Sequence, residues 1–275
     1  MWWKTQDIGS IMVKYSYVTL LSSDNFLPGV IMLYLSLKRV NSKYQLHVLC
    51  SDTISEKSYK NLIRYNLSYQ RLNEHIIINE DINKEEGYDH WNRTFDKLYM
   101  WTLTQFDKIV YLDSDMQVIA NIDSLFDSPH MSAVRADAFN EPGLDKLNSG
   151  LMVIVPNIEE FDGMCALLKS NTIQLKRMGD QDVIRAYYCD WGTHPELTLG
   201  AGYNVLYSEV TSGVIKKSDV LPVSVIHYIG SRKPWMVSPR AIWRRSKNNF
   251  LGKHLLRYAI ALYRYFPSFV FCRAK

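Results

Sequence analysis

Short apolar runs alternate with helix-like segments through this chain, and the alternation limits its fold more than any other feature. Strands are expected at residues 17–21, 46–50, 76–78 and 108–112, with helices at 26–40, 55–67 and 94–103. Pro28 suits the first turn of the first helix, and Ser55 suits the N-cap of the second. Strands at 132–134, 151–155 and 223–226 and helices at 159–169 and 181–189 follow less regularly. The pattern predicts an α/β fold with a mostly parallel, doubly wound sheet.

The fourth of these strands ends in an unusual acidic sequence. Its apolar run leads directly into Asp113, Ser114 and Asp115. Carboxylates at the carboxyl end of a buried strand lie where open α/β sheets form their ligand crevice. Two hard oxygen donors this close together suit a divalent cation such as Mn²⁺ or Mg²⁺, which can in turn hold a diphosphate. The alternative is that Asp113 and Asp115 only cap a turn or the next helix.

Size and composition indicate one large domain followed by a tail. The chain has 275 residues, of which 47% are hydrophobic and 22% charged, as in soluble globular proteins. We expect one domain over residues 1–239 and a basic, aromatic tail over 240–275, because no Asp or Glu occurs after Lys233. No apolar run approaches the roughly 20 residues that span a bilayer, and the first residues lack a signal-peptide core.

The spacing of the cysteines indicates free thiols in a reducing compartment. Cys50, Cys165, Cys189 and Cys272 are widely spaced and form no C-x-x-C pair. Buried, reduced thiols are therefore expected, which predicts a cytoplasmic protein.

Several polar clusters stand where apolar runs stop. Lys97 precedes the aspartates, Asn148-Ser149-Gly150 precedes a strand, and Gly179-Asp180-Gln181 opens a helix. His227 ends the last strand, with Gly230 and Lys233 close behind. Together they indicate a single crevice lined from one edge of a sheet.

These motifs, taken in order, resemble the glycogenin-like glycosyltransferases of family 8. The resemblance covers about residues 17–235 and rests on the blocks 94–101, 110–115, 120–127, 148–150, 179–181 and 227–235. It implies a nucleotide-sugar-binding, Rossmann-like single domain of the glycosyltransferase A type. It also implies a UDP-sugar donor, retention of configuration, and Mn²⁺ as cofactor, with Mg²⁺ as the other option.

The same resemblance assigns roles to individual residues. Asp113, Asp115 and His227 would ligate the metal, while Lys233 and the amide of Gly230 would stabilise the leaving diphosphate. The catalytic residues would be Lys97, Asp180 and Gln181. Asp180, Gln181 and Asn148 would hydrogen-bond the hydroxyl groups of the sugar. Donor binding would involve Leu20, Ser22, Ser23, Phe26, Lys97, Ser114, Asn148, Gly230 and Lys233.

Each of these roles has a simpler alternative. His227 could be a packed histidine at a strand end, and Lys97 a solvated helix lysine. Asp180 could be an N-cap, because it follows a glycine at the start of a helix.

The chain also departs from the glycogenin pattern. Arg177 stands where the family has an acidic residue, and for an arginine expected before Lys97 the nearest candidate is Arg93. Tyr203 and Tyr207 lie in the region of glycogenin's self-glucosylated tyrosine but not in its sequence context. A separate acceptor is therefore expected.

The basic tail contains an amphipathic pattern. At ~100° per residue, Lys253, Arg257 and Arg264 share one face of a helix. The opposite face is apolar and is formed by Leu251, Leu255, Ala259, Leu262 and Phe266. Such a helix can lie on an anionic membrane at its inner face, or it can pack on the body. The tail resembles those of bacterial family members that glycosylate lipid-linked acceptors.

The first functional hypothesis is a Mn²⁺-dependent hexosyltransferase acting on a cell-surface glycan or a lipid-linked acceptor. The second is a self-glycosylating primer of polysaccharide synthesis. A phosphatase is disfavoured because Gln117 stands where its motif needs Thr or Val, and a nucleotidyltransferase because no glycine-rich loop follows the first strand. A non-catalytic lipid- or nucleic-acid-binding module would leave the metal-ligand pattern unexplained, and no nucleic-acid partner is expected.

Overall fold

A mixed sheet forms the centre of the molecule. The computed structural model describes residues 13–76, 94–136, 146–170, 179–231, 233–247 and 249–265. Within them, the strands of this sheet are β1 (Tyr15–Leu21), β2 (Leu46–Cys50), β3 (Ser68–Arg71), β4 (Lys108–Leu112), β6 (Ser132–Arg135), β7 (Leu147–Ile154) and β8 (Thr198–Leu199). Their order is β3-β2-β1-β4-β7-β6-β8. The first four run parallel to one another, whereas β7 is antiparallel to both β4 and β6.

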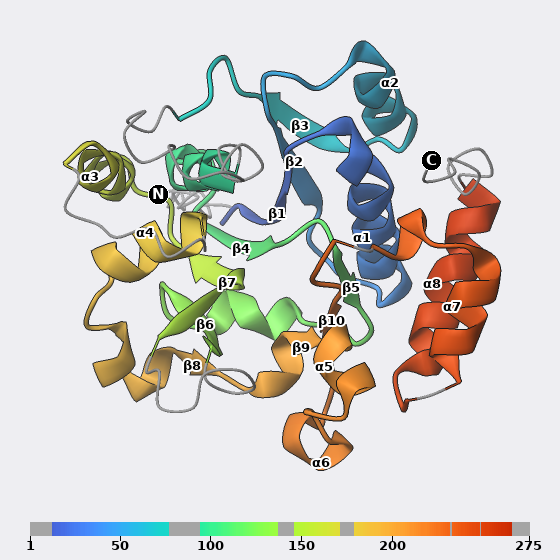
Figure 1. Cartoon of the computed structure of the whole chain (residues 1–275). Helices are drawn as coiled ribbons and strands as arrows, with labels where there is room; N and C mark the ends of the chain where they lie inside the picture. The colour runs from blue at the N-terminus through green and yellow to red at the C-terminus, as the bar shows by residue number, and fades with distance from the viewer. Residues whose placement is uncertain are drawn as a thin grey trace, which may run out of the picture.

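Helices cover both faces of this sheet (Figure 1). On one face lie α1 (Leu27–Arg39) and α2 (Glu56–Arg64), and on the other lie the 3-10 helix η4 (Thr94–Thr102), α3 (Ile158–Lys169) and α4 (Asp180–Tyr187). Alternation along β1 explains the two layers: Tyr17 and Leu21 pack with the first group, and Val18 and Leu20 with the second. The predicted α/β class with a mostly parallel core is confirmed.

A second, small sheet continues from the acidic turn after β4. It consists of β5 (Met116–Val118), β10 (Val225–His227) and β9 (Val205–Leu206), with β10 in the middle. β10 pairs antiparallel with β5, so that His227 lies opposite Met116. The last apolar strand is thereby brought beside Asp113 and Asp115.

Short elements complete the connections. They are η1 (Asp24–Phe26), η5 (Asp123–Asp127), η7 (Trp191–Thr193), η8 (Pro195–Leu197), η9 (Ala201–Tyr203), α5 (Tyr207–Ser212), α6 (Lys217–Val220) and η10 (Pro234–Met236).

The C-terminal helices α7 (Pro239–Ser246) and α8 (Gly252–Tyr265) pack on the body beside α1 (Figure 1). Leu251, Leu255 and Ala259 are almost fully buried in the same core cluster as Tyr17. The apolar face of α8, which could have contacted a membrane, is therefore covered by protein. The alternative in which this helix packs on the body is the arrangement observed. The side chain of Leu262 and residue Phe266 lie outside the described part. Within that part, no helix is long and apolar enough to span a bilayer.

Three local predictions need adjustment. The third strand of the sheet is Ser68–Arg71, which the sequence analysis did not predict. Of the strand expected at 76–78, Ile76 lies outside any strand, and residues 77 and 78 lie outside the described residues. Among the described residues, β3 pairs with β2 alone and is half exposed, so its residues are polar and carry no apolar signal. The helix expected over 94–103 is of the 3-10 type, and the one expected to reach residue 67 ends at Arg64.

The cysteine prediction also needs correction. Cys50 is buried, whereas Cys165 is half-buried and Cys189 is exposed. All three are free thiols, and Cys272 lies outside the described residues.

Candidate active site

The acidic turn is held by two backbone hydrogen bonds and by the packing of helix α1. The Asp113 amide donates to the carbonyl of Gly150 at 2.9 Å, and the Tyr228 amide donates to the carbonyl of Asp115 at 3.0 Å. Helix α1 passes directly behind the turn at Gly29, where a Cβ atom would collide with the carbonyl oxygen of Ser114. The backbone of the turn is therefore held rigidly, and its carboxylates project from a defined position.

His227 completes a three-residue cluster with these carboxylates. Its Nε2 lies 3.0 Å from Oδ1 of Asp115 and 3.7 Å from Oδ2 of Asp113. One potential ligand atom from each residue lies within 4.8 Å of the others. Gly150 permits this approach, because a Cβ there would lie 2.9 Å from Cε1 of His227.

A hydrogen-bond chain orients the imidazole. Nδ1 of His227 lies 2.9 Å from Oδ1 of Asn204, whose Nδ2 donates to Oδ1 of Asn148 at 2.7 Å. Because an amide oxygen can only accept, Nδ1 carries a proton, and Nε2 is the ring nitrogen that could offer its lone pair to a bound metal. Two carboxylates and such an imidazole fit a divalent cation that prefers mixed oxygen and nitrogen ligands, such as Mn²⁺.

Lys97 is buried between two carboxylates. Its Nζ lies 2.7 Å from Oδ2 of Asp180 and 3.0 Å from Oδ1 of Asp113. Burial by itself would lower the pKa of Lys97, but the two carboxylates outweigh it and raise the pKa above its usual value. The solvated-lysine alternative is therefore wrong, and Lys97 is a permanent cation inside the site.

Asp180 does not act as an N-cap. The cap position of α4 is Gly179, and Asp180 is the first helical residue. Its carboxylate accepts from the hydroxyl of Ser149 at 2.9 Å in addition to the contact with Lys97. Burial raises the pKa of this carboxyl, and the charge of Lys97 opposes the rise. Gln181 accepts from the Ser149 amide at 2.9 Å, so both α4 residues face the predicted crevice.

Lys233 approaches the acidic turn from the opposite side. Its Nζ donates to Oδ2 of Asp115 and, at 3.1 Å, to the carbonyl of Tyr228. Burial tends to raise the pKa of Asp115, but His227 and Lys233 lower it below its usual range. Gly230, with φ of +90°, makes the turn that returns the loop to the site.

The loop after β1 lies next to Lys233. Phe26 is half-buried with its ring 5.9 Å from Nζ of Lys233, and Ser22 and Ser23 are half-buried in the same loop. Leu20 differs, because its side chain packs into the core; only its backbone can serve a ligand. Ser114 is buried within the acidic turn itself.

Sequence reasoning missed three residues that support the site. Asn204 fixes His227, Ser149 contacts Asp180, and Tyr111 donates a hydrogen bond to Oδ1 of Asp113 at 2.9 Å. Tyr111 and Ser149 lie in segments that the sequence analysis identified for other residues, whereas no local sequence pattern marks Asn204 as functional. Arg93 and Arg177 lie outside the described residues.

Comparison with known proteins is consistent with this geometry. The family model described as glycosyl transferase family 8 matches residues 17–237. An uncharacterised protein of Acanthamoeba polyphaga mimivirus is 28% identical over 90% of this chain and 92% of its own length. An Arabidopsis thaliana protein named as a putative UDP-glucuronate:xylan α-glucuronosyltransferase is 32% identical, over 81% of this chain and 36% of its own length. Glycogenin-1 of Caenorhabditis elegans is 28% identical, over 80% and 50% respectively.

The fold also occurs among solved structures. An active-site variant of the enzyme LgtC superposes with a TM-score of 0.61 at 16% identity, covering 90% of this chain and 95% of its own. This likeness shows a shared fold. The chain spans only about a third to a half of the length of its plant and nematode relatives.

Proposed function

Because the chain belongs to glycosyl transferase family 8, we propose that it moves a hexose from a UDP-sugar to a separate glycan or lipid-linked acceptor. The observation that carries the proposal is the cluster of Asp113, Asp115 and His227 beside the buried Lys233. A metal–diphosphate site needs such a set of ligands with a cation next to it. Mn²⁺ is the proposed metal, with Mg²⁺ as the alternative.

The reaction exchanges one bond to the anomeric carbon for another. The acceptor's hydroxyl oxygen forms a bond to C1 of the sugar while the C1–oxygen bond to the diphosphate breaks. UDP leaves with the electron pair and takes up the hydroxyl proton. The metal, when bound, supplies Lewis-acid stabilisation of the charge on the diphosphate.

Lys233 is placed to add to that stabilisation. It contacts Asp115 and lies on a loop that includes Gly230, whose lack of a side chain allows a phosphate to approach the backbone amide. A cation is worth most to the diphosphate when the negative charge is greatest, at bond breakage. We infer that Lys233 exchanges Asp115 for a phosphate oxygen when the donor binds.

Lys97 and Asp180 form the other wall, where the sugar would lie. Asp180 is held by Lys97 and Ser149, so its carboxylate is positioned without help from the ligand. Such a preorganised carboxylate can accept hydrogen bonds from sugar hydroxyls, with Asn148 and Gln181 near it.

The decisive test is metal-dependent release of UDP. Wild-type protein should release UDP from at least one member of a UDP-sugar panel when Mn²⁺ is added. Asp115→Asn and His227→Ala should each remove this activity, while circular dichroism remains that of the wild type. Wild-type rates in either variant would exclude the metal assignment.

Self-glycosylation is the second candidate, favoured by the similarity to glycogenin. Of the tyrosines in the expected region, Tyr207 is buried and its hydroxyl donates to the carbonyl of Arg245 at 3.4 Å. It is therefore poorly exposed as an acceptor. Incubation with the UDP-sugar followed by intact-mass measurement decides: an added hexose on the protein would favour this second function.

We further propose that the C-terminal helices approach an anionic membrane through their outer face. Trp243 on α7 is 54% exposed and Ile260 on α8 is 60% exposed. Exposed basic residues surround them, namely Arg240, Arg244, Lys247, Lys253 and Arg257. Basic and aromatic side chains on one surface suit a lipid headgroup region. The proposed membrane contact therefore involves this exposed face and excludes the apolar face of α8, which is buried.

A further inference from the structure

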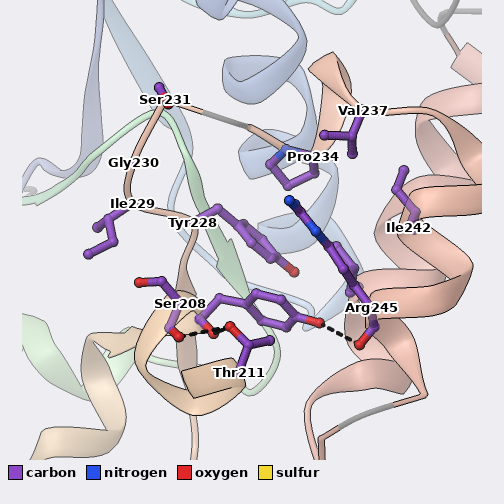
Figure 2. A pocket seen from close by; sticks show the side chains of 12 residues that line it. Ser208, Thr211, Tyr228, Ile229, Gly230, Ser231, Pro234, Val237, Ile242 and Arg245 are labelled. Carbon is purple, nitrogen blue, oxygen red and sulfur yellow. Dashed lines mark hydrogen bonds between the residues drawn. The ribbon is translucent and has the colours of Figure 1, made fainter. Parts of the chain in front are cut away.

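A cavity of about 400 Å³ lies beyond the carboxyl ends of β9 and β10. It is bounded by α5, by the loop that follows β10, and by α7 and α8 (Figure 2). Its volume is within the range of sites that bind small molecules. The rings of Tyr207 and Tyr228 form one wall, with their centroids 5.3 Å apart, and Ile242 contributes to the other.

Among the described residues that line the cavity, one is a cation. Arg245 is half-buried on α7, and its side chain extends beside the Tyr228 ring toward Pro234 (Figure 2). Its carbonyl oxygen accepts from the Tyr207 hydroxyl at 3.4 Å and from the Asn249 amide at 3.3 Å, which fixes the backbone. In the described residues, the guanidinium group has no hydrogen-bond or ion-pair partner.

Among the described residues that line the cavity, no acidic side chain balances the charge of Arg245. The sequence contains no Asp or Glu after Asp219. A half-buried guanidinium group has lost part of its hydration, so an anion is the partner that restores its interactions. The hydroxyls of Ser208 and Ser231 add neutral hydrogen-bonding groups to the same lining. This composition fits a phosphate or carboxylate attached to a ring.

The cavity shares its loop with the reaction centre. Gly230 lines the cavity, and Lys233, three residues later, contacts Asp115. Tyr228 contributes its ring to the cavity and its carbonyl to Lys233. A molecule bound here would therefore lie against the loop that the donor diphosphate contacts from the other side.

We propose that this cavity is a second binding site, and that its ligand is a small ring compound whose phosphate or carboxylate group is held by Arg245. The inference goes beyond the proposed glycosyl transfer, because none of the lining residues belongs to the wall where the donor sugar would lie. The anionic group of the ligand lies at the α7 end, and its ring packs on Tyr207 and Tyr228. Arg245 binds the ligand and exchanges no proton with it.

The test compares charged and neutral sugars on the full chain. UDP and Mn²⁺ are added first, so that the donor side is filled, and glucose 6-phosphate or glucose is then titrated by calorimetry. Wild-type protein should bind glucose 6-phosphate at least tenfold more tightly than glucose. Arg245→Gln should abolish that preference, and Arg245→Lys should restore part of it. The matched control is Arg244→Gln, an exposed neighbour on α7, which should keep the wild-type preference.

The outcomes separate this inference from the proposed function. Equal binding of the two sugars by wild-type protein, or a preference that survives in Arg245→Gln, would overturn the anionic-ligand inference. Failure of wild-type protein to bind UDP with Mn²⁺ would instead count against the proposed function, and the sugar titration without UDP would still report on the cavity.

Discussion

At the residue scale, the site is a balance of buried charges. Asp113, Asp115 and Asp180 face two buried lysines, Lys97 and Lys233, at contact distances. Leaving His227 aside, three carboxylates meet two ammonium groups, so the formal charges of these five side chains sum to one negative charge. A divalent cation would reverse that sign and prepare the site for a diphosphate, which is why the residues fit a metal better than a purely structural ion-pair network.

Lys233→Ala should lower the turnover number for UDP release more than it weakens donor binding. The lysine charge matters most when the diphosphate gains charge, so its loss acts on the transition state. Steady-state kinetics at saturating Mn²⁺ separate kcat from KM. An unchanged kcat with a raised KM would mean that the lysine binds substrate and transition state equally.

Asn204→Ala should weaken the apparent affinity for Mn²⁺ by about 10- to 100-fold. The amide oxygen of Asn204 holds Nδ1 of His227 at 2.9 Å, and without it the imidazole loses its orientation and its defined tautomer. The measurement is UDP release against Mn²⁺ concentration. Saturating metal should recover much of the rate, whereas a loss that metal cannot recover would point to general misfolding.

At the element scale, the sequence predicted a strand well where that strand is buried and long enough to show a pattern. Strand β4 and its aspartates were predictable because a strand buried on both faces is a continuous apolar run. The polar edge strand β3 and the two- and three-residue strands β9 and β10 carry too little pattern for the sequence to define their limits. Asn204 joins the site because β9 pairs with β10 and because its amide donates to Asn148, contacts that no local sequence pattern predicts.

Gly29→Ala should disrupt the contact between α1 and the acidic turn. A Cβ at this position would collide with the Ser114 carbonyl and would lie 2.6 Å from the Trp235 ring. The helix must then move away, at a cost of about 1–3 kcal/mol in the free energy of unfolding. Urea denaturation measures this loss, and UDP release should fall because the turn carries Asp113 and Asp115. Gly200→Ala is the matched control, since a Cβ there meets no atom within 4 Å.

At the scale of the whole molecule, the C-terminal helices belong to the core. Leu251, Leu255, Tyr258 and Ala259 are each at most 3% exposed. Fully burying one large apolar side chain contributes about 1.5–3 kcal/mol, and a domain has only about 5–15 kcal/mol of net stability. A chain that ends at Ser246 should therefore unfold more than 10 °C lower than the full chain or fail to fold, as thermal circular dichroism would show. An unchanged unfolding temperature would mean that α8 is dispensable to the body.

The membrane proposal depends on the outer face of the same helices, so it needs variants that leave the core intact. Trp243→Glu combined with Ile260→Glu changes two exposed side chains and should alter the unfolding free energy by less than about 0.5 kcal/mol. Each basic residue near an anionic surface contributes roughly 1 kcal/mol, so wild-type protein should sediment with phosphatidylserine-containing vesicles at low salt and detach as salt is added. The double variant removes the apolar anchors and adds repulsion, so its binding should drop at least tenfold. Ile63→Glu, at a 61% exposed position on α2, is the control for a charge added elsewhere. If wild-type protein ignores these vesicles at low salt, the outer face of α7 and α8 is an ordinary solvated surface, and the acceptor must reach the site from solution.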